Sequence, residues 1–264
     1  MKNRLNQRKI RFYEYISQSL KINMKKAITI LICLLITDSI FAGTGADFLR
    51  IPLGSRAIGM AQSFTGLADD VFAVHYNPGG LSFISDSEIQ TEHSLWINNS
   101  NIEFIGYVQP LSLGAFSTSL IYTHLPKMSK IEEGELVGNF TAYNYCANFG
   151  FGFPLSEIFG IGVNFKGIQS SINKKTANSI ACDLGLMVCS NNKRFKFGFA
   201  TQNIGTSIKF KKEKDNLPLT YRIGTSYKFI LPKEYSKIIL CIDGIRLPEN
   251  EYEVSVGIEH TLFN

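Results

Sequence analysis

The sequence has few of the residues from which enzymes and metalloproteins build their sites. Its four histidines are scattered without an HExxH spacing, and none of its five cysteines belongs to a CxxC pair. It contains no GxSxG motif, phosphate-binding loop or dinucleotide-binding glycine pattern. We therefore expect no catalytic residue, no metal site and no cofactor, and the chain is not expected to be an enzyme.

The sequence also lacks a long apolar run. The main stretch of this kind, residues 27–36, has ten residues, whereas a membrane-spanning helix needs roughly 20. It follows two lysines and precedes a plausible cleavage site at Ala42. We expect residues 24–42 to be a cleaved signal peptide rather than a membrane anchor, and residues 1–23 to be an incorrectly assigned start or an extended n-region.

Beyond this leader the sequence has no excess of positive charge. The formal net charge is +5, but eight of the 27 Lys and Arg residues lie at positions 1–26, where Glu14 is the only acid. Residues 43–264 are therefore nearly neutral. Because phosphate backbones are bound by concentrated positive charge, no nucleic-acid partner is expected.

The chain is organised around residues 47–81, DFLRIPLGSRAIGMAQSFTGLADDVFAVHYNPGGL. Glycines interrupt this stretch, so it is expected to be neither helix nor strand throughout. It closes on four turn-forming residues in a row, Asn77-Pro78-Gly79-Gly80, which predict a sharp chain reversal before the first strand.

Two adjacent carboxylates, Asp69 and Asp70, lie in the middle of this stretch. Sequence neighbours on a loop seldom converge on one substrate atom, which argues against a metal site or an acid–base pair. We expect them to cap a turn or to pair with an interior basic residue through charge-assisted hydrogen bonds.

Beyond residue 84 the dominant period of the sequence is two. Near the end of the chain, for example, Val254, Val256 and Ile258 alternate with polar or small residues. This pattern predicts about ten strands in residues 84–264: 87–96, 101–109, 112–123, 140–152, 159–170, 178–189, 194–204, 218–229, 236–243 and 251–260.

Alternation alone suits either a soluble sandwich or a membrane barrel. Long polar connections, such as residues 124–139 and 205–217, alternate with short turns such as residues 110–111, as in outer-membrane barrels. We therefore expect an all-β antiparallel transmembrane barrel. In a barrel the polar face would line a lumen, whereas in a sandwich it would face water. The lumen-lining candidates are Glu103, Asn164, Lys166, Asp183, Arg222 and Lys228.

Residues 46–81, which begin ADFLRIPLGS and end VHYNPGGL, closely resemble the opening of the UPF0164 and PorV/PorQ group of outer-membrane proteins. That group is similar to the FadL-type transporters of long-chain fatty acids. The resemblance implies that residues 43–83 form an N-terminal hatch inside the barrel lumen. It assigns gating to the acidic run and to the turn, in which Gly79 replaces the usual alanine. The gating candidates are Asp69, Asp70, Asn77, Pro78, Gly79 and Gly80.

The same resemblance implies a barrel of fourteen strands, so about four more would follow Asn264 and the chain would be truncated at its C-terminus. A complete ten-stranded barrel is the alternative. The implied location is the outer membrane of a diderm bacterium. The implied function is passage of small hydrophobic molecules, such as long-chain fatty acids, with outer-membrane lipids and the barrel-assembly machinery as partners. The alternatives are a PorV-like component of a protein secretion system that binds cargo or partner proteins, and a structural surface barrel without transport.

Overall fold

The computed structural model describes residues 44–132, 135–173, 175–210, 213–230 and 236–262. The expected signal peptide, residues 24–42, and the residues before it lie outside this part.

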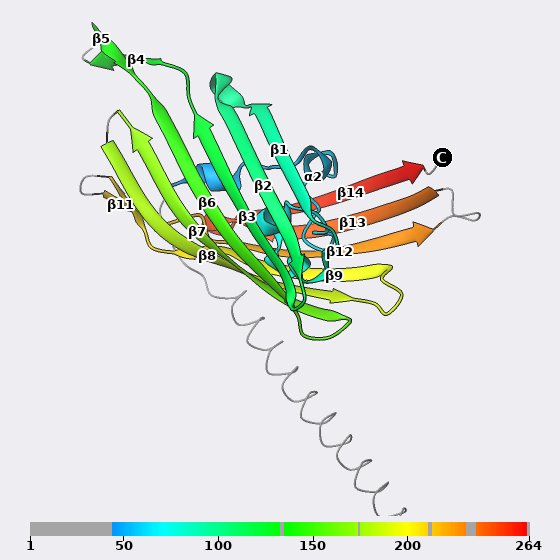
Figure 1. Cartoon of the computed structure of the whole chain (residues 1–264). Coiled ribbons are helices and arrows are strands. Elements are labelled where there is room, and N and C mark those ends of the chain that lie inside the picture. Colours follow the sequence, from blue (N-terminus) through cyan, green and yellow to red (C-terminus); the bar gives the residue numbers. More distant parts are fainter. Residues whose placement is uncertain (1–43, 133–134, 174, 211–212, 231–235, 263–264) are drawn as a thin grey trace, which may run out of the picture. The chain divides into compact units, whose positions relative to one another are not determined.

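Ten antiparallel strands form the main sheet, in the order β1-β2-β3-β6-β7-β8-β9-β12-β13-β14 (Figure 1). Within the described residues, β1 and β14 are its two edges and do not pair with each other. The predicted all-β antiparallel architecture is confirmed, and the predicted strand positions agree closely with the observed ones. The strands are β1 Glu88–Leu95, β2 Asn101–Leu111, β3 Gly114–His124, β6 Ala142–Pro154, β7 Phe159–Ile172, β8 Lys175–Cys189, β9 Phe195–Gly205, β12 Thr220–Ile230, β13 Ser236–Arg246 and β14 Tyr252–Leu262.

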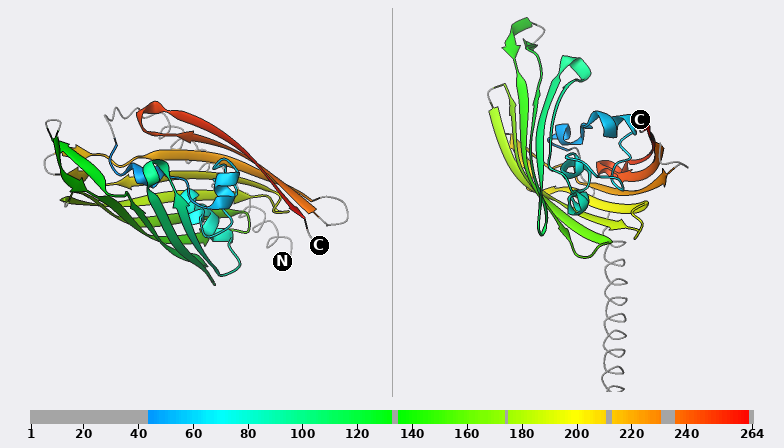
Figure 2. Two further views of the ribbon diagram at one scale, coloured as in Figure 1. Left: turned by 90° about the horizontal axis from the view of Figure 1, so that it is seen from above. Right: turned by 45° about the vertical axis from the view of Figure 1, so that its right-hand side comes forward.

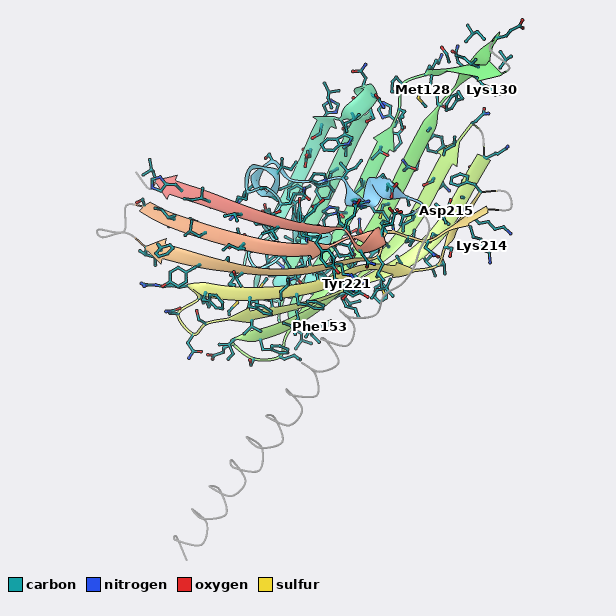
Figure 3. All side chains as sticks on the ribbon, turned by 180° about the vertical axis from the view of Figure 1, so that it is seen from behind. Met128, Lys130, Phe153, Lys214, Asp215 and Tyr221 are labelled. Carbon is teal, nitrogen blue, oxygen red and sulfur yellow. The ribbon has the colours of Figure 1, made fainter. Side chains whose placement is uncertain are left out.

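Two short hairpins lie in connections that were predicted to be loops. β4 (Met128–Glu132) pairs with β5 (Glu135–Phe140), and β10 (Ile208–Phe210) pairs with β11 (Glu213–Asp215). Figure 3 shows Met128 and Lys130 of β4 at one end of the main sheet and Phe153 of β6 toward the other. The ends that carry these hairpins are called the loop ends of the strands below.

The two faces of the main sheet differ in composition. In β6, Asn148 and Gly150 are buried, whereas Phe149 and Phe151 between and beside them are exposed. The buried face packs against residues 44–83, called the inner segment, and is called the inner face; the opposite one is the outer face. Figure 2 shows the sheet curving around the inner segment.

The inner segment consists of short helices joined by turns. Its glycines and its two prolines, Pro52 and Pro78, prevent longer helices. The short helices are η1 (Asp47–Arg50), α2 (Ser55–Gly59), α3 (Ala73–Tyr76) and η2 (Pro78–Phe83); η3 (Ile97–Asn99) and η4 (Pro248–Asn250) lie in connections between strands. Its apolar side chains form the core with the inner face: Phe64, Leu67, Val71, Tyr76 and Leu81 are each at most 2% exposed. None of the helices in the described part of the chain is long and apolar enough to cross a membrane.

Candidate functional site

The turn after α3 is held by the side chain of Asn77. This residue is extended, with φ −157° and ψ 100°, and its side chain is fully buried. Its Oδ1 accepts from the Gly79 amide at 2.9 Å, while Nδ2 donates to the carbonyls of Thr65 at 2.9 Å and Leu186 at 3.0 Å. Asn77 therefore caps η2 and ties the turn both to the inner segment and to β8.

Glycines of the turn and glycines of the sheet allow the two main chains to come into direct contact. A Cβ added to Gly79 would lie 2.7 Å from the Leu186 amide nitrogen, and one added to Gly80 would collide with the Ala68 carbonyl. On the sheet, a Cβ on Gly162 of β7 would collide with the Pro78 carbonyl. The turn can occupy this place only because side chains are absent at these positions.

The glycine contacts continue across the inner face. Added Cβ atoms would meet the inner-segment main chain at Gly152 of β6, Gly185 of β8, Gly198 of β9, Gly224 of β12 and Gly257 of β14. The inner segment from Met60 to Ser82 therefore lies directly on the backbone of the sheet. Sequence reasoning missed this band, although glycines that recur at inward positions of separate strands were a usable signal.

Arg56 of α2 is the centre of a cluster of carboxylates. Its Nη1 lies 2.6 Å from Asp69 Oδ1 and 3.2 Å from Asp70 Oδ2, and its Nε donates to Glu259 Oε2 of β14 at 2.6 Å. Asp69 also lies 4.0 Å from Lys196 Nζ. The two acids thus pair with interior bases, as their sequence suggested, but the sequence had not identified Arg56 or Glu259.

Burial and neighbouring charges shift the two aspartates in opposite directions. Burial raises the pKa of Asp70 to about 6, although Arg56 and the Phe72 amide favour its charged form. Burial would also raise the pKa of Asp69, but Lys196 and Arg56 bring that pKa below its ordinary value. Asp69 is therefore the fixed anion of the cluster, and Asp70 can change its charge under mildly acidic conditions.

The inner segment contacts both edge strands of the sheet. On β1, Glu92 Oε2 accepts from the Gly54 amide at 2.6 Å and Glu88 Oε2 accepts from the Val71 amide at 3.3 Å. On β14, Glu259 accepts from Arg56. Carboxylates on both edge strands therefore bind the inner segment. Through these contacts the inner segment links β1 to β14, which do not pair with each other among the described residues.

Three of the lumen-lining candidates form one buried network. Lys166 Nζ lies 2.8 Å from Asp183 Oδ2, and both side chains are almost fully buried. Asn164 Nδ2 donates to the same carboxylate oxygen at 2.9 Å and to the Val74 carbonyl at 3.2 Å. Asp183 lies at a register shift between β8 and β9, where its Oδ1 accepts from the Asn203 amide at 2.7 Å. The network holds α3 against the sheet.

The other three candidates divide between the two faces. Arg222 and Lys228 lie on the inner face of β12. Glu103 lies on the outer face of β2, where its Oε1 is 2.8 Å from His93 Nδ1, so its predicted inward position is wrong. The physical reason is that Ile102, Phe104 and Val108 of β2 face inward, and Phe104 stacks on Phe72 with ring centroids 4.6 Å apart.

Comparison with known proteins assigns the chain to a family. The model of the uncharacterised protein family UPF0164 matches residues 39–226. Two proteins of Treponema pallidum (strain Nichols), each named UPF0164 protein, are similar to the chain. One is 27% identical over 181 residues, which cover 60% of this chain and 53% of the relative; the other is 24% identical over 220 residues, which cover 71% and 51%. The chain spans about half the length of these relatives. By the extent of the family match, it belongs to the UPF0164 family.

Proposed function

We propose that this protein is a β-barrel protein of the outer membrane of a diderm bacterium, with the outer face of its sheet in contact with lipid. The observation that carries the proposal is the polarity of the two faces. Every strand of the main sheet exposes a large apolar side chain on the outer face, such as Ile89, Ile105, Leu120, Phe149, Phe165, Ile180, Phe195, Ile223, Ile242 and Val256.

A continuous apolar surface over ten strands is costly in water. Each large side chain forgoes roughly 1.5–3 kcal/mol when it is left exposed, and soluble proteins rarely present apolar patches of more than a few hundred Å². In a bilayer the same surface is solvated by hydrocarbon, while polar side chains on the inner face are paired or hydrated. This arrangement favours a membrane protein over a soluble sandwich.

Aromatic rings at two levels of the outer face also support contact of this face with lipid. Toward the loop ends, Tyr122 stacks on Tyr145 at 4.6 Å between ring centroids, with Tyr143 at 5.6 Å from Tyr145. Toward the other ends, Phe116 lies 5.2 Å from Phe151. Tyr143 and Phe153 are ten residues apart on β6, which is roughly 33 Å along a strand and about 25 Å across a bilayer at a tilt near 40°. That matches the apolar band of outer-membrane barrels.

Within this barrel, residues 44–83 act as the hatch of a FadL-like pathway for small hydrophobic molecules such as long-chain fatty acids. The resemblance to the PorV/PorQ group and to FadL-type transporters supports this part of the proposal. The glycine contacts support a fixed position for Met60 to Ser82. Gating therefore involves residues 44–59 more readily than the turn at Asn77.

One observation favours a second candidate, a PorV-like component of a secretion system. The β4–β5 hairpin extends beyond the main sheet and exposes Ile131, Leu136 and Val137 (Figure 1). Exposed apolar side chains on a projecting hairpin suit contact with a partner or cargo protein. Transport alone gives no reason for them.

Purification of the native protein from its own membrane tests both candidates. If the protein serves passage of hydrophobic molecules, mass spectrometry should find fatty acids bound to it and no protein in fixed ratio. A stoichiometric partner protein without bound fatty acid would contradict transport and support the secretion component. Recovery from a fraction other than the outer membrane would contradict both.

A further inference from the structure

A pocket of about 290 Å³ lies on the loop-end side of the inner segment. One wall is η1 with the residues up to Pro52, and the other is formed by the inner faces of β9, β12, β13 and β14. His75 and Tyr76 of α3 line it, and Gln202 Nε2 of β9 donates to their carbonyls at 2.5 and 3.2 Å. Since α3 leads directly into the glycine-held turn, the pocket has a fixed base.

Two cations line the pocket: Arg50 of η1, which lies 3.8 Å from the exposed Glu251, and Arg222, whose side chain is only 7% exposed. Its Nε donates to Thr65 Oγ1 at 3.0 Å and its Nη2 to the Gln62 carbonyl at 2.8 Å. Its carboxylate neighbour Asp243 is 3.8 Å away and already accepts from the Thr65 amide at 2.8 Å. Nη1 of Arg222 has no hydrogen-bond partner within the described residues. A buried guanidinium with an unused donor suits a ligand carboxylate.

Negative charge lines the same pocket. Glu253 lies on the inner face of β14 and is exposed, and Asp47 belongs to η1. The lining also has apolar side chains, among them Leu49, Ile51 and Leu247, with Trp96 directly after β1. Charges of both signs beside apolar surface fit a small molecule with two opposite charges and an apolar part. They suit a long acyl chain poorly, because its length needs an extended apolar channel.

We propose that this pocket binds a zwitterionic α-amino acid with an apolar side chain. Arg222 receives the carboxylate, Glu253 and Asp47 receive the ammonium group, and Leu49 of η1 and Ile51, directly after η1, contact the side chain. This site takes a different class of ligand from the proposed hydrophobic substrates, although its η1 wall belongs to the residues proposed to gate their passage. It does not depend on transport, because the pocket is formed within the folded chain.

Isothermal titration of the full chain, purified in detergent, with three isosteric probes tests the proposal. L-Leucine carries both charges, 4-methylpentanoate lacks the ammonium group, and 3-methylbutylamine lacks the carboxylate. L-Leucine should bind about tenfold or more tightly than either analogue, since each unmatched charge leaves a pocket group unpaired. Equal or tighter binding of 4-methylpentanoate would show a simple anion site and overturn the proposal, as would no binding of L-leucine.

A pair of variants assigns the ammonium contact. Glu253→Gln should weaken the binding of L-leucine by about tenfold. The affinity for 4-methylpentanoate should stay unchanged or rise slightly. Glu249→Gln changes an exposed glutamate in the neighbouring η4 that does not line the pocket, and it should have no effect on either probe. Retention of full leucine affinity in Glu253→Gln would contradict the assigned role. The comparison of the three probes on the unaltered chain still decides the ligand class if a variant fails to fold.

Discussion

Asn77 Nδ2 donates to the Leu186 carbonyl at 3.0 Å, which joins the turn of the inner segment to β8 across 109 positions of sequence. The same side chain makes two further hydrogen bonds and is fully buried. Asn77→Ala should therefore leave several buried groups unpaired, at roughly 1–3 kcal/mol each. We expect faster proteolysis of the inner segment and a lower free energy of unfolding. Asn191→Ala, at an exposed position in a turn, is the control; equal protection of the two variants would show that Asn77 does not hold the turn.

Main-chain contact through glycine predicts a difference between two positions of the same strand. Gly162→Ala should displace the Pro78 carbonyl and lower stability by about 1–3 kcal/mol, as overpacking commonly does. Gly167→Ala has open space around its new Cβ and should be close to neutral. Chemical denaturation of the two proteins in detergent measures the difference. If both variants unfold at the same denaturant concentration, the inner segment does not lie on the sheet as described.

The carboxylates around Arg56 give a third prediction. Arg56→Gln would leave Asp69, Asp70 and Glu259 together without this cation. Because Arg56 is about one-third exposed, the loss should lie between that of a surface pair, up to ~1 kcal/mol, and that of a buried pair, about 3–5 kcal/mol. Hydrogen exchange should show α2 opening more often.

Arg50→Gln is the matched control for this variant. Arg50 makes a longer contact, 3.8 Å, with the exposed Glu251, and its loss should have little effect. Equal exchange of α2 in the two variants would argue against a fastening role for Arg56.

The dependence of stability on pH follows from two groups of the inner segment with opposite signs. Burial, with Lys166 and Arg222 nearby, lowers the pKa of His75 to about 3, so its contribution is present above pH 6.5 and is lost as pH falls toward 3. Asp70 faces Arg56, Asp69 and Glu88, and its pKa of about 6 favours the packed state as pH falls from 6 toward 3.8. The His75 shift is the larger, so the protein should be less stable at pH 4.5 than at pH 7.5.

His75→Gln should abolish or reverse this difference, because Asp70 then dominates between the two pH values, whereas the lowered pKa of Asp69 affects stability mainly below pH 3.8. Thermal unfolding at the two pH values measures it, with His93→Gln on the outer face as the control. An unaltered pH dependence in His75→Gln would show that His75 is not the responsible group.

Sequence alone predicted the ten long strands well, because each alternates over many residues and is bounded by turn residues. It could not predict β10 or β11, since three-residue strands have too few positions for a period to be visible. Glu103 was assigned to the wrong face because β2 is apolar inward as well as outward, and only contact with Phe72 distinguishes its faces.

Those parts of the candidate site whose residues are close together in the sequence were predictable. Asn77, Pro78 and the two glycines form a recognisable turn signal within four residues. Arg56 and Glu259 meet across 203 positions, and no local pattern marks either residue. The glycine band likewise depends on strand register, which brings Gly162 opposite Gly185 and Gly198 opposite Gly224.

Contact of the outer face with lipid hydrocarbon can be tested with a single fluorophore. Trp96→Phe removes the chain's one tryptophan, and Phe165→Trp then places one in the middle of β7 on the outer face. Leu136→Trp in the same background places one on β5, beyond the main sheet. In bilayers whose acyl chains carry bromine near their centre, we expect strong quenching of the tryptophan at position 165 and little at position 136. Equal, weak quenching at both positions in the folded protein would contradict contact of the outer face with lipid.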